Sequence, residues 1–140
     1  MQGIILYGPP ASGKDTITGA LHALDSRYVL FPRIKCGPGK ASGYRMVSAT
    51  ELSELRAHGE ILWENERYGS VYAVDRSGLR EHLAAHTPVL HLGQPDAVEA
   101  VREEFFEVDW TVADLSCQLE TAKTRLSKRG DVKLEDRLRT

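Results

Sequence analysis

The sequence predicts an α/β fold in which a parallel sheet is flanked by helices. Short apolar runs alternate with amphipathic helical segments along most of the 140 residues, and this alternation is typical of parallel sheets. The first apolar run, at residues 4–7, passes through a glycine-rich turn into a helical segment. The length fits one domain with a buried core. Ligands of such sheets bind outside the carboxyl ends of the strands, where we expect the functional residues.

The first helix is predicted over residues 14–24. Ile17, Ala20, Leu21 and Leu24 recur at helical spacing, so we expect this apolar face to pack on the sheet. Because the helix follows the first strand after a short turn, its N-terminus is expected near the carboxyl end of that strand.

The next stretch combines a strand, a basic loop and a helix. Residues 28–31 form a short apolar run that predicts a second strand. Residues 32–45 are rich in glycine, proline and basic side chains, and predict a loop. Two interpretations of this loop stay open: a solvated surface loop, or a site for a second anionic substrate. Ser48 and Glu51 have the capping-box spacing that predicts a helix over 48–58.

The second half of the chain continues the alternation. Residues 60–74 are rich in β-branched and aromatic side chains and predict a pair of short strands. An amphipathic helix that carries Leu79, Leu83 and Ala84 is predicted over 75–86. The remaining predicted elements are a buried strand at 88–92, a helix at 96–106, a strand at 108–115, a helix at 118–128 and a charged, helix-like segment at 130–140.

The glycine-rich turn has the pattern of a phosphate-binding loop, or P-loop. Gly8 is followed by four residues and then by Gly13 and Lys14, between a predicted strand and a predicted helix. Backbone N–H groups and a helix N-terminus then converge on one point, and the lysine adds a positive charge, which favours a di- or triphosphate. Asp15 stands where a serine or threonine usually offers a hydroxyl to Mg²⁺. The predicted ATP-binding residues are Gly8, Pro9, Pro10, Ala11, Ser12, Gly13, Lys14, Asp15 and Thr16.

Composition narrows the class of protein. The net charge of −2 gives no reason to expect nucleic acid or an anionic membrane as the main partner. Cys36 and Cys117 are isolated, which favours a reduced protein without structural zinc. The chain enters a core strand directly after Gly3, without room for a leader segment, and no apolar run reaches membrane-spanning length. We therefore expect a cytoplasmic protein that is a monomer or homodimer.

The order of these pieces resembles the guanylate kinase family of P-loop nucleoside monophosphate kinases. The resemblance covers nearly the whole chain and is most specific at GYRMVSATELSELRAHGEILWENERYGSVYAV, which is similar to the family's acceptor-binding region. The family ends with a further strand and helix that are missing before Thr140. The implied organisation is one domain over 1–140, with a core at 1–31 and 75–120, a small acceptor-binding β subdomain at 32–74 and a helical lid at 121–140.

The resemblance also implies roles for residues around the acceptor. Glu64 and Glu66 are both candidates for the glutamate that reads guanine, with Leu62 at the strict register. His91 and Gly93 occupy the positions at which the family carries aspartates. The implied acceptor-binding residues are Arg33, Lys35, Tyr44, Glu64, Tyr68 and Ser70.

The implied reaction is phosphoryl transfer from ATP, with Mg²⁺, to a small phosphorylated acceptor such as a nucleoside monophosphate of the GMP type. This chemistry needs in-line positioning and neutralisation of charge on the transferring group. Lys14 would hold the β- and γ-phosphates, and Asp15 or Thr16 would hold Mg²⁺ and the α-phosphate region, with Asp15 as the predicted metal ligand. The lid arginines that would stabilise the transition state are Arg125, Arg129 and Arg137.

Two alternatives to the nucleotide kinase are kept. The ribose 1,5-bisphosphate phosphokinases resemble guanylate kinases and share the Lys-Asp pair after the second glycine, here Lys14 and Asp15. The second alternative is a non-catalytic guanylate-kinase-like binding module, which would use the acceptor site for a phosphorylated or protein partner.

Overall fold

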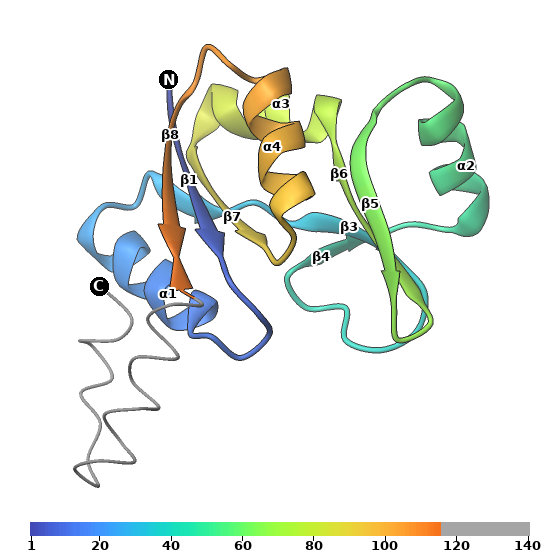
Figure 1. Cartoon of the computed structure of the whole chain (residues 1–140), viewed down its shortest axis with the longest axis horizontal. Coiled ribbons are helices and arrows are strands. Elements are labelled where there is room, and N and C mark those ends of the chain that lie inside the picture. The colour runs from blue at the N-terminus through green and yellow to red at the C-terminus, as the bar shows by residue number, and fades with distance from the viewer. Residues whose placement is uncertain (116–140) are drawn as a thin grey trace, which may run out of the picture.

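The computed structural model describes residues 1–115 and contains a parallel sheet that carries the P-loop (Figure 1). The strand order is β2-β7-β1-β8, and each neighbouring pair is parallel. The P-loop leaves β1, which lies between β7 and β8. This arrangement confirms the predicted α/β class. The strands are β1 (Gln2–Tyr7), β2 (Tyr28–Leu30), β7 (Thr87–Leu92) and β8 (Asp109–Asp114).

Consecutive residues of a strand point to opposite faces of the sheet. Both faces of this sheet carry buried apolar side chains, and helices cover both of them. Ile5 packs in a buried cluster with residues of α3 and α4, including Leu79 and Val101. Leu6 belongs to the opposite cluster, against which Ile17 and Leu21 of α1 pack. The P-loop helix is therefore alone on its side of the described sheet. The bounds of these helices are Lys14–Leu24 for α1, Arg76–Ala85 for α3 and Pro95–Glu104 for α4.

A second, mixed sheet lies beside the first, with the strand order β4-β3-β6-β5. Strand β6 pairs antiparallel with β3 and β5, whereas β3 and β4 are parallel. Helix α2 (Ala49–Ala57) connects β4 to β5 and begins at the predicted capping box, in which Glu51 and Ser48 exchange hydrogen bonds of 2.8 and 3.1 Å. The strands are β3 (Arg33–Cys36), β4 (Tyr44–Met46), β5 (Ile61–Arg67) and β6 (Ser70–Asp75).

The prediction of one loop over residues 32–45 is wrong, since this stretch contains β3 and the first two residues of β4. Strand β3 is held by β6, with Ile34 opposite Ala73, and Ile34 is fully buried. Glycine and proline are local signals of a turn, whereas this strand exists through pairing with residues far away in sequence. Tertiary pairing therefore overrides the local pattern.

The predicted apolar face of α1 is also wider than the observed one. Ile17 and Leu21 contact the sheet, but Ala20 is exposed and Leu24 is 83% exposed. Leu24 is the last residue of the helix, where the chain turns away toward β2. Ala84 of α3 is likewise exposed. Helical spacing predicts a face, but the width of the contact depends on the neighbouring element.

Over residues 1–115 the structure contains no helix of the length and apolarity that spanning a membrane requires.

Candidate functional site

The P-loop has the backbone geometry of an anion-binding turn. The N–H of Gly8 donates to the carbonyl of Leu92 at 3.1 Å, which ties the loop to the end of β7. Ala11 and Gly13 have positive φ angles of 61° and 97°, a conformation that can direct successive N–H groups to one side. Gly13 is the N-cap of α1 and has no side chain that could occupy the first N–H groups of the helix. These groups are therefore available to a phosphate.

Lys14 extends back over this loop. Its ammonium group donates to the carbonyl oxygens of Gly8 and Pro9 at 2.7 and 2.8 Å and to Ser12 Oγ at 3.3 Å. Burial, reinforced by the positive charge of Arg33, lowers the pKa of Lys14 to about 8. The lysine is thus charged at neutral pH, but it loses its proton more readily than a solvated lysine.

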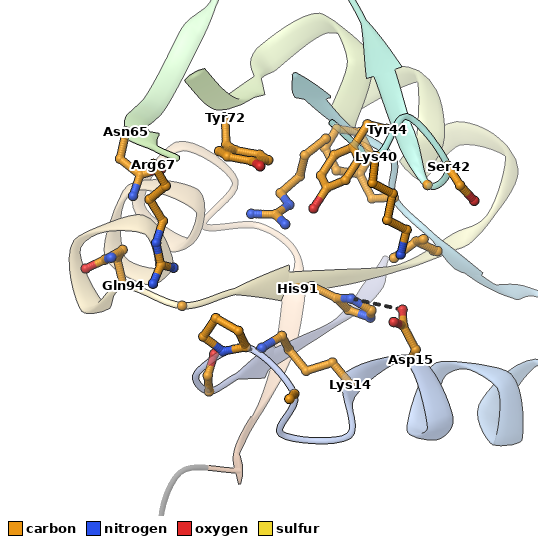
Figure 2. Close-up of a pocket in the computed structure, with 18 of the residues that line it drawn as sticks. Lys14, Asp15, Lys40, Ser42, Tyr44, Asn65, Arg67, Tyr72, His91 and Gln94 are labelled. Atoms are coloured by element: carbon orange, nitrogen blue, oxygen red, sulfur yellow. Dashed lines mark hydrogen bonds and ion pairs between the residues drawn. The ribbon is translucent and has the colours of Figure 1, made fainter. Parts of the chain in front are cut away.

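A cleft of about 340 Å³ separates the P-loop from the second sheet (Figure 2). Asp15 is the only carboxylate among its described lining residues, so the cleft is electropositive and suits phosphate groups. Its basic lining residues are Lys14, Arg33, Lys40 and Arg67. The predicted ATP-binding residues that line it are Gly8, Pro10, Ala11, Gly13, Lys14 and Asp15, whereas Pro9, Ser12 and Thr16 lie outside the lining.

Arg33, the first residue of β3, lines the cleft from the second sheet. Its guanidinium carbon is 5.6 Å from the ring centre of Tyr44 and 5.9 Å from that of Tyr72. Burial lowers the pKa of Arg33 below its ordinary value, although the two tyrosines act in the opposite direction. The group remains a cation at neutral pH. A partly desolvated guanidinium is a strong partner for a phosphate that enters the cleft.

Lys35, two residues further along β3, faces a neighbouring hollow instead. It is 3% exposed, and its ammonium donates to the carbonyl of Lys40 at 2.7 Å. The hollow shares Tyr44 and Tyr68 with the main cleft. Tyr68 is at the tip of the β5–β6 turn, where it has a φ of 53° and is 84% exposed. Four of the six predicted acceptor residues therefore gather around these two adjoining spaces: Arg33, Lys35, Tyr44 and Tyr68.

Glu64 and Ser70, also predicted to bind the acceptor, do not line either space. Glu64 accepts hydrogen bonds from Arg56 of α2, the shortest at 2.6 Å. Ser70 is 1% exposed and donates to the carbonyl of Pro38 at 2.9 Å. Side chains alternate along β5, and Trp63, Asn65 and Arg67 line the cleft, so Glu64 and Glu66 point to the opposite face.

Asp15 and His91 meet beside the P-loop. The carboxylate Oδ1 is 3.8 Å from His91 Nδ1 (Figure 2). The other ring nitrogen of His91 lies 2.6 Å from Thr18 Oγ1. Burial, followed by the charges of Arg33 and Lys14, lowers the pKa of His91 to about 4, although Asp15 acts to raise it. The side chain of Asp15 is 85% exposed. An exposed carboxylate beside a phosphate site fits the Mg²⁺ that accompanies nucleotides, because this ion commonly takes one or two carboxylates together with phosphate oxygens and water.

Comparisons with known proteins agree with this geometry. A family model described as an AAA domain matches residues 4–139. The chain belongs to this P-loop family.

Two guanylate kinases are among the relatives of this family member. It is 29% identical over 131 residues to the guanylate kinase of Ralstonia nicotianae and 28% identical over 132 residues to that of Aromatoleum aromaticum. These alignments cover 90% and 91% of the chain, but only 59% and 64% of the relatives. The crystal structure of guanylate kinase from Anaplasma phagocytophilum matches with a TM-score of 0.53 at 18% identity, over 92% of this chain and 68% of that one. The predicted resemblance to guanylate-kinase-like P-loop kinases is confirmed.

Several cleft residues of this P-loop protein were not predicted as site residues. Trp63, Asn65 and Arg67 face the cleft from alternate positions of β5, and Tyr72 and Gln94 also line it. The period of two along 63–67 is the signal that could have identified the first three. Tyr72 is placed by pairing, since it lies opposite both Lys35 and Asn65.

Not every basic residue near the cleft is available for a ligand. Arg45 donates to both carboxylate oxygens of Asp75 and to the carbonyl of Pro32. Asp75 is 3% exposed and also caps α3 through the N–H of Gly78 at 3.1 Å. Arg45 therefore joins the second sheet to α3. The predicted lid at 121–140 and its arginines Arg125, Arg129 and Arg137 lie outside the described residues.

Proposed function

We propose that this protein is an ATP-dependent phosphotransferase whose acceptor is a nucleoside monophosphate. The observation that carries the proposal is the cleft itself, which is lined by the P-loop with Lys14 and by Arg33 and Arg67 of the second sheet. Two phosphorylated substrates that met there would place their negative charges between opposing cations. The guanylate kinase relatives support the same class of reaction.

In this mechanism the P-loop N–H groups and Lys14 bind the donor's phosphates. Asp15 would hold Mg²⁺, which supplies positive charge at the β- and γ-phosphates when bound. Arg33 and Arg67 would hold the acceptor's phosphate in line with the γ-phosphorus. An oxygen of the acceptor's phosphate then forms a bond to the γ-phosphorus. The bond between the γ-phosphorus and the oxygen that bridges the β- and γ-phosphates breaks, and ADP leaves with that oxygen. An ionised acceptor phosphate needs no base, so a cleft whose described lining has no carboxylate other than Asp15 is consistent with this chemistry.

A sugar phosphate is the second candidate for the acceptor. Guanine recognition in this fold would need a carboxylate in the cleft, and both candidates, Glu64 and Glu66, lie on the other face of β5. The amides of Asn65 and Gln94 line the cleft instead. This arrangement favours an acceptor that is recognised by its phosphate and hydroxyl groups, such as ribose 1,5-bisphosphate.

The test is ADP release by the intact protein, coupled to a spectroscopic assay, against a panel of acceptors. The panel contains GMP, dGMP, the other nucleoside monophosphates and ribose 1,5-bisphosphate, each with ATP and Mg²⁺. We expect turnover that depends on one class of acceptor. ADP release that is the same with and without every acceptor would refute the kinase proposal and favour a non-catalytic binding module. Mg²⁺-ATP should also raise the melting temperature at millimolar concentration.

A further inference from the structure

Asp15 and His91 form a pair of possible metal ligands, one with an oxygen donor and the other with a nitrogen donor. Asp15 is in the first turn of α1, and His91 is near the carboxyl end of β7, with its side chain only 11% exposed. Their facing atoms, Oδ1 and Nδ1, are 3.8 Å apart. Two separate elements of the fold therefore bring a carboxylate and an imidazole together beside the phosphate-binding loop (Figure 2).

The contact with Thr18 determines which ring nitrogen of His91 carries the hydrogen and leaves the other nitrogen, which faces Asp15, as an acceptor. Its hydroxyl donates to the carbonyl of Lys14 at 2.8 Å, which uses the only hydrogen of that hydroxyl. His91 Nε2, 2.6 Å from the same oxygen, must then supply the hydrogen of the second bond. In the neutral ring the lone pair is on Nδ1, which faces the carboxylate of Asp15. Two acceptors that face each other are stabilised by a cation between them.

We propose that Asp15 Oδ1 and His91 Nδ1 together bind the divalent cation of the nucleotide, and that the imidazole makes this site favour Mn²⁺ over Mg²⁺. The inference rests on the proposed nucleotide binding. Two donors about 2.1 Å from one octahedral ion are about 3.0 Å apart when adjacent and about 4.2 Å apart when opposite. The present separation of 3.8 Å reaches the adjacent geometry when the 85% exposed side chain of Asp15 shifts by about 1 Å toward His91.

The remaining ligands of the ion come from the nucleotide and from water. Within residues 1–115 there is no group of three or more His, Cys, Asp or Glu side chains that could hold a metal by itself. Phosphate oxygens and water therefore complete the coordination of the Asp15–His91 pair, as is usual for nucleotide-bound ions. Mg²⁺ prefers oxygen ligands, whereas imidazole binds first-row transition ions more readily. Replacement of one oxygen ligand by His91 Nδ1 shifts the preference toward Mn²⁺.

The experiment measures the affinities of the intact protein for Mn²⁺ and Mg²⁺ in the presence of ADP, which needs no acceptor and no turnover. Bound Mn²⁺ is followed by its electron paramagnetic resonance signal, and Mg²⁺ by competition. His91→Gln keeps a donor toward Thr18 but removes the nitrogen that faces Asp15. His91→Asp offers oxygen in its place. His58→Gln, at an exposed histidine after α2, is the matched control.

We expect the ratio of Mn²⁺ to Mg²⁺ affinity to fall by about tenfold or more in His91→Gln and His91→Asp, and to stay unchanged in the His58 control. Asp15→Asn, at an exposed position where folding is not at risk, should weaken the binding of both ions by about tenfold. Circular dichroism establishes that each variant is folded.

An unchanged ratio in folded His91→Gln and His91→Asp would overturn the metal assignment and leave His91 as a structural partner of Thr18. An unchanged affinity for both ions in Asp15→Asn would overturn it equally. If the wild-type protein binds no ADP with either ion, the proposed function itself fails. These failures are distinguishable because nucleotide binding is measured separately from the preference between ions.

Discussion

Replacement of Arg33 by methionine is expected to have opposite effects on function and on stability. The guanidinium is enclosed by Tyr44 and Tyr72, and burial lowers its pKa below the ordinary value. A lowered pKa in a cation means that its surroundings disfavour the charge in the folded protein. Methionine has a similar length and keeps the contact with both rings without the charge. Arg33 is therefore placed for a ligand at some cost to the unliganded fold.

The two effects differ in size as well as in sign. Each charge-assisted hydrogen bond to a phosphate contributes about 1.5–3 kcal/mol, and a guanidinium can donate two. Allowing for compensation by Arg67 and Lys40, which also line the cleft, we expect a loss of about 2–4 kcal/mol. This loss corresponds to a decrease in kcat/KM for the acceptor of roughly 30- to 700-fold. Removal of the desolvated charge should raise the unfolding free energy by about 1 kcal/mol, after the lost attraction to the two rings is subtracted.

The assays are steady-state kinetics with the acceptor that the panel identifies, and thermal unfolding without ligand. Arg27→Met is the matched control, since Arg27 is exposed and pairs with Asp25 at the end of α1, away from the cleft. It should alter kcat/KM by less than about twofold. If Arg33→Met lowers the melting temperature by several degrees and kcat/KM changes no more than in the control, Arg33 is a structural residue and the reasoning is wrong.

The remaining predictions concern the P-loop, the ion pair of Arg45 and Asp75 at the start of α3, and Glu64, one of the glutamates considered for guanine recognition. Because the pKa of Lys14 is lowered to about 8, affinity for ATP should fall as pH rises from 7 to about 9, with proton uptake on binding that calorimetry detects and that Lys14→Met abolishes. The lowered pKa of Lys14 has the opposite consequence for unfolding. Between pH of about 8 and pH 10.5, the ordinary lysine pKa, the unfolded chain binds more protons than the folded chain. The unfolding free energy of the wild type, measured relative to Lys14→Met, should therefore rise with pH. Asp75→Asn weakens the ion pair with Arg45 and the cap of α3, and urea titration should give a loss of about 2–4 kcal/mol; a loss below about 1 kcal/mol would contradict the structural role. ATP should bind much more tightly with Mg²⁺ than with a chelator, and Asp15→Ser should narrow that gap, since the carboxylate repels bare triphosphate but binds the ion; equal affinities in the two conditions would reject this explanation. Glu64→Gln should leave discrimination among acceptors unchanged, because Glu64 pairs with Arg56 outside the cleft; a tenfold change in the GMP preference would show that the side chain reaches the acceptor.

The sequence predicted well those elements that are specified by residues close to one another in the chain. The spacing of Ser48 and Glu51 identified the start of α2, because a capping box is formed by residues three positions apart. The P-loop was identified for the same reason, since a glycine turn, a lysine and a following helix are contiguous. Strand β3 was missed because glycine and proline dominate its surroundings, whereas its partner β6 is distant in the chain.

For the candidate site, the sequence by itself determined the phosphate loop, the class of fold and a group of basic and tyrosine residues near an acceptor. Only the tertiary structure decided which of them share a space. Pairing of β5 with β6 turns Trp63, Asn65 and Arg67 into the cleft and Glu64 away from it. Parallel pairing of β1 with β7 places His91 beside Asp15, 76 positions apart in the sequence. The register of a strand sets which face each side chain occupies. That register is fixed by pairing with strands distant in the sequence, which the residues of the strand itself do not identify.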